Sequence, residues 1–169
     1  MSATQRLAEL GITLPAVTAP VAAYVPAVQS GPLVFVSGQL PWVDGALLRT
    51  GKVGGEVSAE DAALDARQCA LNALSAMDSL VGLDAITRIV KVVGFVSSAP
   101  GFTGQPGVIN GASELFGEVF LDSGGHARSA VGVAELPLGT PVEVEVIAEI
   151  SAAGPTMRLA GPAAPGIQA

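Results

Sequence analysis

Apolar residues recur along this chain with two kinds of spacing, one typical of helices and one typical of strands. From Ser58 to Gly82, alanines and larger apolar residues return every three or four positions, which indicates a helix with one apolar face. Ser58 and Asp61 together are suited to cap its start, and Gly82 is suited to end it. The same spacing predicts a second helix from about Val108 to Phe120.

The strand-like spacing occurs in five segments rich in β-branched residues: Val21–Val28, Leu33–Ser37, Ile86–Val96, Ala127–Leu136 and Val142–Ile150. A short run with glycine and proline separates the first two, so they are expected to form an antiparallel hairpin. In the last segment, apolar residues alternate mainly with glutamates, which predicts one buried face and one acidic face.

The order of these elements is strand, strand, helix, strand, helix, strand, strand. This order suits an α+β sandwich in which two helices pack on one face of a mixed sheet. The opposite face of the sheet then has no cover within the chain. Because 50% of the residues are hydrophobic, we expect self-association to cover that face.

The length of 169 residues allows one well-buried core and is too short for two comfortable domains. We assign residues 21–152 to one domain. Residues 1–20 are interpreted as an N-terminal arm, with a short helix over Thr4–Leu10 and an extended stretch from Pro15 to Pro20. Residues 153–169 are mostly Ala, Gly and Pro, and this tail is expected to be disordered.

Charge and composition argue against several classes of protein. A net charge of −7, from 8 Lys and Arg against 15 Asp and Glu, disfavours a broad phosphate-binding surface, so nucleic acid is not an expected partner. Cys69 is the only cysteine and His126 the only histidine, so one chain cannot build a disulfide framework or a Cys/His zinc site. No stretch reaches the ~20 apolar residues that a membrane span requires, and no signal peptide is evident. These features predict a cytoplasmic protein.

The usual motifs of nucleotide-binding and hydrolytic sites are absent from the sequence. The segment Gly45–Val53 lacks the spacing and the hydroxyl residue of a phosphate-binding loop. Without a second histidine or a Gly-x-Ser-x-Gly sequence, the common hydrolase triads lack their parts, apart from arrangements centred on His126. Cys69 lies within a predicted helix with no neighbouring base, so it is interpreted as a small buried residue.

Arg128 interrupts an otherwise apolar strand and is the main candidate for a binding residue. Its planar guanidinium matches a carboxylate in a two-pronged geometry and keeps its charge, so one interpretation is an anchor for a small carboxylic acid. The other interpretation is an ion pair with Glu143 or Glu145 on the next strand. The residue pattern alone favours the ion pair.

Several short motifs together give a stronger indication than any single residue. They are SGQLP at Ser37–Pro41, HARSAVGVAELP at His126–Pro137, Phe95 with Val96, Asn110, VEVEVIA at Val142–Ala148, and Tyr24 thirteen residues before Ser37. In order and approximate spacing, from about Pro20 to Ala148, the chain resembles the Rid family, the imine and enamine deaminases also called YjgF or UK114 proteins.

This resemblance implies a chorismate-mutase-like α+β fold, assembled as a homotrimer with clefts between subunits. Arg128 resembles the arginine that binds the substrate carboxylate, and Glu143 resembles the glutamate associated with the attacking water. The other residues that resemble the lining of this cleft are Tyr24, Ser37, Gly38 and Asn110. The implied activity is hydrolysis of reactive imine or enamine intermediates of amino acids, such as 2-iminobutanoate and 2-iminopropanoate, to 2-oxo acids and ammonia. The resemblance implies no cofactor and no metal.

The chain also departs from the well-studied branch of that family. Ala130 stands where those proteins commonly carry a cysteine two residues after the arginine, and the loop Ser97–Gly107 is longer. Trp42 and His126 flank the two main motifs and are interpreted as packing or rim residues. These departures indicate a divergent branch with a changed pocket. The alternative function is non-catalytic binding of a small carboxylate metabolite, or of a partner protein, in the same cleft.

Overall fold

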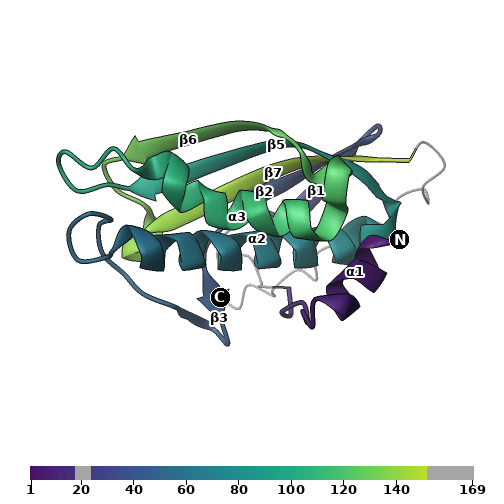
Figure 1. Cartoon of the computed structure of the whole chain (residues 1–169), viewed down its shortest axis with the longest axis horizontal. Coiled ribbons are helices and arrows are strands. Elements are labelled where there is room, and N and C mark those ends of the chain that lie inside the picture. The colour runs from purple at the N-terminus through teal and green to yellow at the C-terminus, as the bar shows by residue number, and fades with distance from the viewer. Residues whose placement is uncertain (18–23, 152–169) are drawn as a thin grey trace, which may run out of the picture.

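A five-stranded sheet with two long helices across one of its faces dominates the computed structural model, which describes residues 1–17 and 24–151 (Figure 1). The strands follow the order β1-β2-β7-β5-β6 across the sheet. Their bounds are β1 Ala27–Ser30, β2 Leu33–Gln39, β5 Ile86–Ser97, β6 Ala127–Val133 and β7 Val142–Ile150. Neighbouring strands are antiparallel except β5 and β6, which are parallel. The predicted α+β sandwich with a mixed sheet is therefore confirmed.

The two long helices are α2, Ala59–Val81, and α3, Gln105–Phe120. The Ser58 hydroxyl accepts the backbone N–H of Asp61 and so caps α2 as predicted. The second helix begins at Gln105, before the predicted start near Val108. The intervening proline and glycine resemble a turn, but proline is well tolerated in the first turn of a helix because its missing N–H has no partner there.

The N-terminal helix α1, Ala3–Glu9, packs beside α3 (Figure 1). Ser2 and Gln5 form a capping box at its start. Ala3 and Leu7 are buried, and Arg6 Nε donates to the carbonyl oxygen of Glu118 at 2.9 Å. The arm therefore begins with a helix that contacts the helix layer. Part of the extended stretch expected from Pro15 to Pro20, and the predicted disordered tail, lie outside the described residues.

Two of the predicted strands are shorter than expected. The first begins at Ala27, because Pro26 has no N–H to donate to a strand ladder, and residues 21–23 lie outside the described part. The fourth ends at Val133, ahead of the short 3-10 turn Pro137–Gly139. The β2 and β7 predictions begin at the right residue and hold over their length, with β2 two residues longer.

A small hairpin lies between β2 and α2 and was not predicted from the sequence. Its strands are β3, Trp42–Val43, and β4, Ala46–Leu47. Asp44 and Gly45 both have positive φ angles, 50° and 81°, which a two-residue hairpin turn of this kind requires. The Asp-Gly pair was the signal that would have found it.

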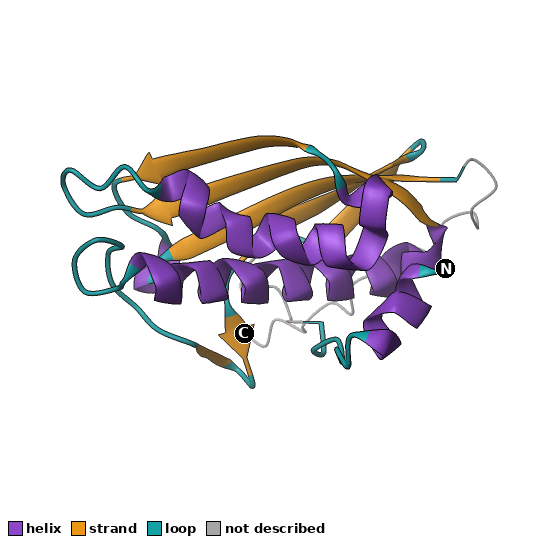
Figure 2. Ribbon diagram, in the orientation of Figure 1, coloured by secondary structure: helices purple, strands orange, loops and turns teal. Residues whose placement is uncertain are grey.

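The two faces of the sheet differ in what covers them (Figure 2). On the helix-covered face, the small buried residues of α2 let the helix approach the sheet closely, among them Ala66, Ala70 and Cys69. The Cys69 thiol is fully buried and its pKa is raised by burial, as expected of a packing residue. A Cβ added to Gly111 on α3 would lie 1.9 Å from the carbonyl oxygen of Ala63, so glycine permits the contact between the two helices.

No described helix covers the opposite face of the sheet, called here the open face. Side chains of β1, β2, β5 and β7 line a hollow of about 270 Å³ there, including Val28, Phe35, Val93, Glu145 and Ile147. Val28 is 49% exposed and Phe35 is 38% exposed. The apolar side chains of this hollow, which also contains Glu145 and Lys91, are what the expected self-association would cover.

No helix in the described part of the chain is both long enough and apolar enough to cross a membrane.

Candidate functional site

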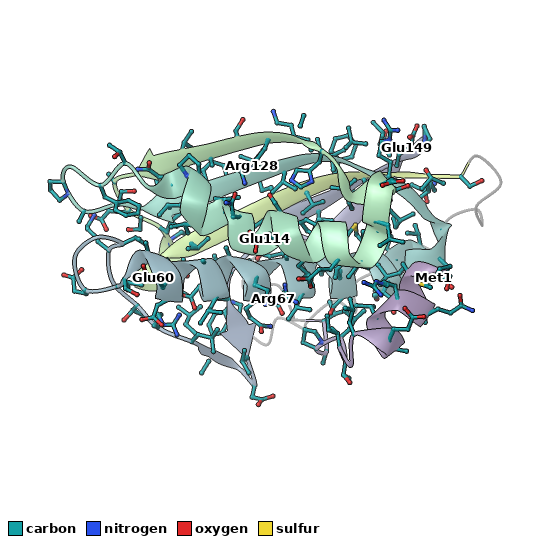
Figure 3. All side chains as sticks on the ribbon, viewed as in Figure 1. Met1, Glu60, Arg67, Glu114, Arg128 and Glu149 are labelled. Carbon is teal, nitrogen blue, oxygen red and sulfur yellow. The ribbon has the colours of Figure 1, made fainter. Side chains whose placement is uncertain are left out.

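Arg128 lies on β6, the edge strand of the sheet, with its side chain toward α3 (Figure 3). Its Nη1 donates to Oδ1 of Asn110 at 2.8 Å and to Oγ of Ser113 at 3.1 Å. Asn110 and Ser113 are three positions apart on α3 and thus lie on one face of that helix. The structure therefore brings together two of the predicted site residues, Arg128 and Asn110, and adds Ser113.

Arg128 has no carboxylate partner among residues 1–17 and 24–151. The basic residues that do have one are Arg6, Arg49, Lys52 and Arg67. The ion pair with Glu143 or Glu145 is wrong, because β5 lies between β6 and β7. In the described structure Nε and Nη2 of Arg128 meet no protein acceptor, so this edge of the guanidinium is available to an anion.

His126 contacts the same group of side chains. Its Nε2 lies 2.9 Å from Oγ of Ser113, and its Nδ1 lies 2.6 Å from the carbonyl oxygen of Gly124. The ring also packs edge-on against Phe116, with 6.1 Å between the ring centroids. His126 thus packs against α3 and is also part of a polar chain that ends at Arg128. Ser113 escaped the sequence analysis because a single serine within a helix carries no signal.

A second group of predicted residues lies where β2 meets β7. The pairing of these strands is irregular between Val36 and Gln39. A Cβ added to Gly38 would lie 1.8 Å from Oε1 of Glu143, so glycine gives the glutamate room to lie over β2. The Ser37 hydroxyl donates to the carbonyl oxygen of Val25 at 2.7 Å, and Tyr24, the residue before Val25, has an exposed side chain.

The surroundings of Glu143 change the pKa of its side chain. Burial raises the pKa of this carboxyl, and the negative charge of Glu145 raises it further. A carboxylate whose pKa is raised is a better proton acceptor for water than an ordinary surface glutamate.

The two groups lie on opposite faces of the sheet within one chain. Glu143 alternates along β7 with Val142 and Val144, which are fully buried beneath the helices, so the glutamate points to the open face. Arg128 instead contacts α3 on the helix-covered side. One copy of the chain therefore does not bring the predicted catalytic pair, Arg128 and Glu143, into one cleft.

In the described part of the chain, no three His, Cys, Asp or Glu side chains are grouped as metal ligands.

Comparison with known proteins agrees with this arrangement of the sheet and motifs. The family model for endoribonuclease L-PSP matches residues 15–150. The chain belongs to the endoribonuclease L-PSP family. Protein TCP17 from Trypanosoma cruzi is 46% identical over 147 residues, which cover 86% of this chain and 92% of that protein.

Solved structures with this fold extend the comparison. A crystal structure of an Agrobacterium tumefaciens protein of unknown function is 43% identical with a TM-score of 0.79, covering 88% of this chain and 92% of that one. The YjgF gene product of E. coli is 26% identical with a TM-score of 0.59, covering 80% of this chain and 98% of that one. The resemblance stated from the sequence motifs is thus confirmed as family membership.

Proposed function

We propose that this protein hydrolyses the C=N bond of small 2-imino acids, releasing ammonia and a 2-oxo acid, in clefts formed between copies of the chain. The observation that carries the proposal is Arg128, whose Nη1 is held by Asn110 and Ser113 while Nε and Nη2 have no acceptor in the described structure. A guanidinium fixed in this way is prepared for a carboxylate, which 2-imino acids carry beside the reacting carbon. Membership of the family supports a Rid-type function in general.

The reaction requires the protein mainly to position the substrate, the attacking water and a proton acceptor. A water oxygen attacks the carbon of the protonated imine while a carboxylate takes one proton from the water, which gives a carbinolamine. The carboxyl group returns that proton to the amino nitrogen. It then takes the hydroxyl proton as the C–N bond breaks, so that ammonia leaves and the 2-oxo acid forms. Glu143 is the proposed proton acceptor, and its raised pKa suits that role. Arg128 holds the substrate carboxylate so that the carbon meets the water in a fixed geometry.

The location of Glu143 on the open face is the reason for placing the cleft between copies. We propose a homotrimer in which the open face of one copy, with Ser37, Gly38 and Glu143, meets the Arg128 edge of its neighbour. The exposed apolar strip around Phe35 and Ile147 is the surface that such contacts would remove from water. Closed cyclic symmetry repeats the same contact for every copy.

The direct test generates imines from a panel of aliphatic and aromatic amino acids with an amino-acid oxidase and follows ammonia and 2-oxo acid release. The protein should accelerate hydrolysis, and Arg128→Ala should lower turnover by roughly ten- to a hundredfold, since a charge-assisted contact is worth about 1.5 to 3 kcal/mol. The matched control is Arg67→Ala, which removes an arginine of α2 that pairs with Glu118 of α3 on the helix-covered side of the sheet. If no imine is hydrolysed faster with protein present, while carboxylates still bind in an Arg128-dependent manner, the non-catalytic alternative holds.

A further inference from the structure

The hydroxyl of Ser113, the imidazole of His126 and the carbonyl of Gly124 form a continuous hydrogen-bonded chain. A carbonyl oxygen only accepts hydrogen bonds, so the 2.6 Å contact places the proton of the neutral imidazole on Nδ1. Nε2 then carries a lone pair. The atom that can donate to it is the Ser113 hydroxyl, 2.9 Å away. A hydroxyl, a base and a group that orients the base are thus aligned as in an activated nucleophile.

The local packing fixes this alignment. A Cβ added to Gly124 would lie 2.3 Å from the carbonyl oxygen of Phe116, so glycine lets the turn after α3 pack against the end of the helix. The ring of Phe116 meets the imidazole edge-on. The contact with Phe116 and the hydrogen bond to the Gly124 carbonyl together fix the imidazole ring of His126, which keeps Nε2 directed at Ser113.

Ser113 behaves differently from an ordinary helical serine. A serine within a helix commonly donates its hydroxyl hydrogen to the carbonyl four residues earlier. Ser75 on α2 does this, donating to the carbonyl oxygen of Leu71 at 3.1 Å. Ser113 instead has its hydroxyl between the imidazole and Arg128, whose Nη1 donates to the same oxygen at 3.1 Å. A positive charge at this distance stabilises negative charge on that oxygen.

We propose that Ser113 is an acyl-accepting nucleophile, with His126 as its general base, which hydrolyses small carboxylic esters. This activity is separate from imine hydrolysis and does not depend on it. Ser113 and His126 are half-buried, and Asn110 and Arg128 are exposed, so a small ester can reach the hydroxyl within one chain.

The reaction needs water as its only co-reactant. Oγ of Ser113 bonds to the ester carbonyl carbon while its proton moves to Nε2 of His126, and the charge on the carbonyl oxygen lies beside the Arg128 guanidinium. The carbon–oxygen bond to the alcohol then breaks, and the alcohol leaves with the proton from Nε2. Water attacks the acyl-serine, gives its proton to Nε2, and the acid departs as the proton returns to Oγ.

The experiment uses p-nitrophenyl acetate with the full-length protein. We expect a burst of nitrophenolate and one acetyl group, which peptide mass mapping locates on Ser113. Ser113→Ala should abolish the burst, and His126→Asn should slow it by about a hundredfold or more. Ser129→Ala is the matched control: this serine is adjacent to Arg128 on β6 with its side chain on the opposite face of the sheet, and its loss should leave the burst intact.

Acetylation only at lysines or at the N-terminus, or a burst that survives Ser113→Ala or is unaffected by His126→Asn, overturns the proposal. The hydrogen-bonded chain would then serve only to hold Arg128. Locating the acetyl group by mass mapping of the unaltered protein tests the proposal even if a variant fails to fold, because this measurement needs no substitution. Imine hydrolysis measured on the same samples separates the two activities, since its absence with the burst present contradicts only the imine proposal.

Discussion

The two faces of the central sheet differ in the side chains that they present and in how deeply these are buried. On the helix-covered face, alternate residues of β7 are fully buried valines and alanine against α2, and glycine at position 111 brings the helices together. On the open face, the alternate residues of β7 are three glutamates and one isoleucine beside exposed Val28 and Phe35. The helix-covered face is close-packed within the chain, whereas the open face leaves apolar side chains exposed beside charged ones, and this is the area that the proposed contact between copies would cover.

The largest effect is expected from charge on the open face. Phe35→Asp removes an aromatic side chain from the proposed contact and adds a carboxylate, which should weaken association by about 4 kcal/mol or more per copy. Sedimentation should then find monomers. The far-ultraviolet circular dichroism spectrum should be unchanged, which shows that the fold is intact.

The control is Leu64→Asp, which places the same charge at a 59% exposed leucine on the outer side of α2. This variant should assemble as the unaltered protein does. Assembly that tolerates Phe35→Asp, or a stable monomer formed by the unaltered chain at micromolar concentration, would show that the open face is not the contact.

The next largest effect is expected on the covered face from one methyl group. Gly111→Ala forces a Cβ into the backbone of α2 and should lower the free energy of unfolding by about 2 to 3 kcal/mol. Gly117→Ala lies on the same helix with nothing within 4 Å of the added Cβ, and it should raise that free energy by about 0.5 to 1 kcal/mol. Urea unfolding of both variants tests the difference, and equal effects would contradict the close helix contact.

A smaller effect concerns Asp65, a buried carboxylate on α2. Asp65 is fully buried and accepts from Arg49 at 2.8 Å, while its Oδ2 has no partner in the described structure. Burial raises the pKa of Asp65 from 3.8 to about 6, and Arg49 opposes part of that rise. The folded protein therefore holds this proton more tightly than the unfolded chain, so stability falls as pH rises from 3.8 to about 6.

The expected loss over this window is about 1 to 3 kcal/mol. Asp65→Asn should remove the slope, as seen in the difference between variant and unaltered protein in urea unfolding at several pH values. Asp61→Asn is the control, since this exposed neighbour also contacts Arg49. A difference between Asp65→Asn and the unaltered protein that stays constant with pH would exclude Asp65 as the titrating group.

Helices and strands were predicted correctly where the spacing of apolar residues and the capping residues both lie within the segment itself. The alternation of valine and glutamate located β7 to the residue, and Ser58 and Gly82 located the ends of α2. The order of strands in the sheet cannot be read from local patterns. Strand β6 pairs in parallel with β5, and the connection between them contains α3. For that reason the sequence placed Arg128 beside Glu143, although the fold puts them on different faces.

The residues of the candidate site could be predicted only where they belong to a family motif. Asn110 meets Arg128 and Gly38 meets Glu143, so the motif residues fall into two real groups. The contact of Ser113 with His126 joins a helix to the start of a strand and has no counterpart in spacing or composition. Side-chain convergence between elements of this kind needs the three-dimensional structure.

The most direct test of the central claim is whether two defective chains complete one site. Arg128→Ala and Glu143→Gln chains, carrying different affinity tags, are co-expressed and the mixed assemblies purified through both tags. Each variant alone should be nearly inactive toward imines. Each mixed trimer contains one cleft that combines an intact Arg128 with an intact Glu143 from the neighbouring copy. Imine hydrolysis should therefore return to about a third of the rate of the unaltered protein. Mixed assemblies that remain as inactive as the separate variants would contradict a cleft shared between copies.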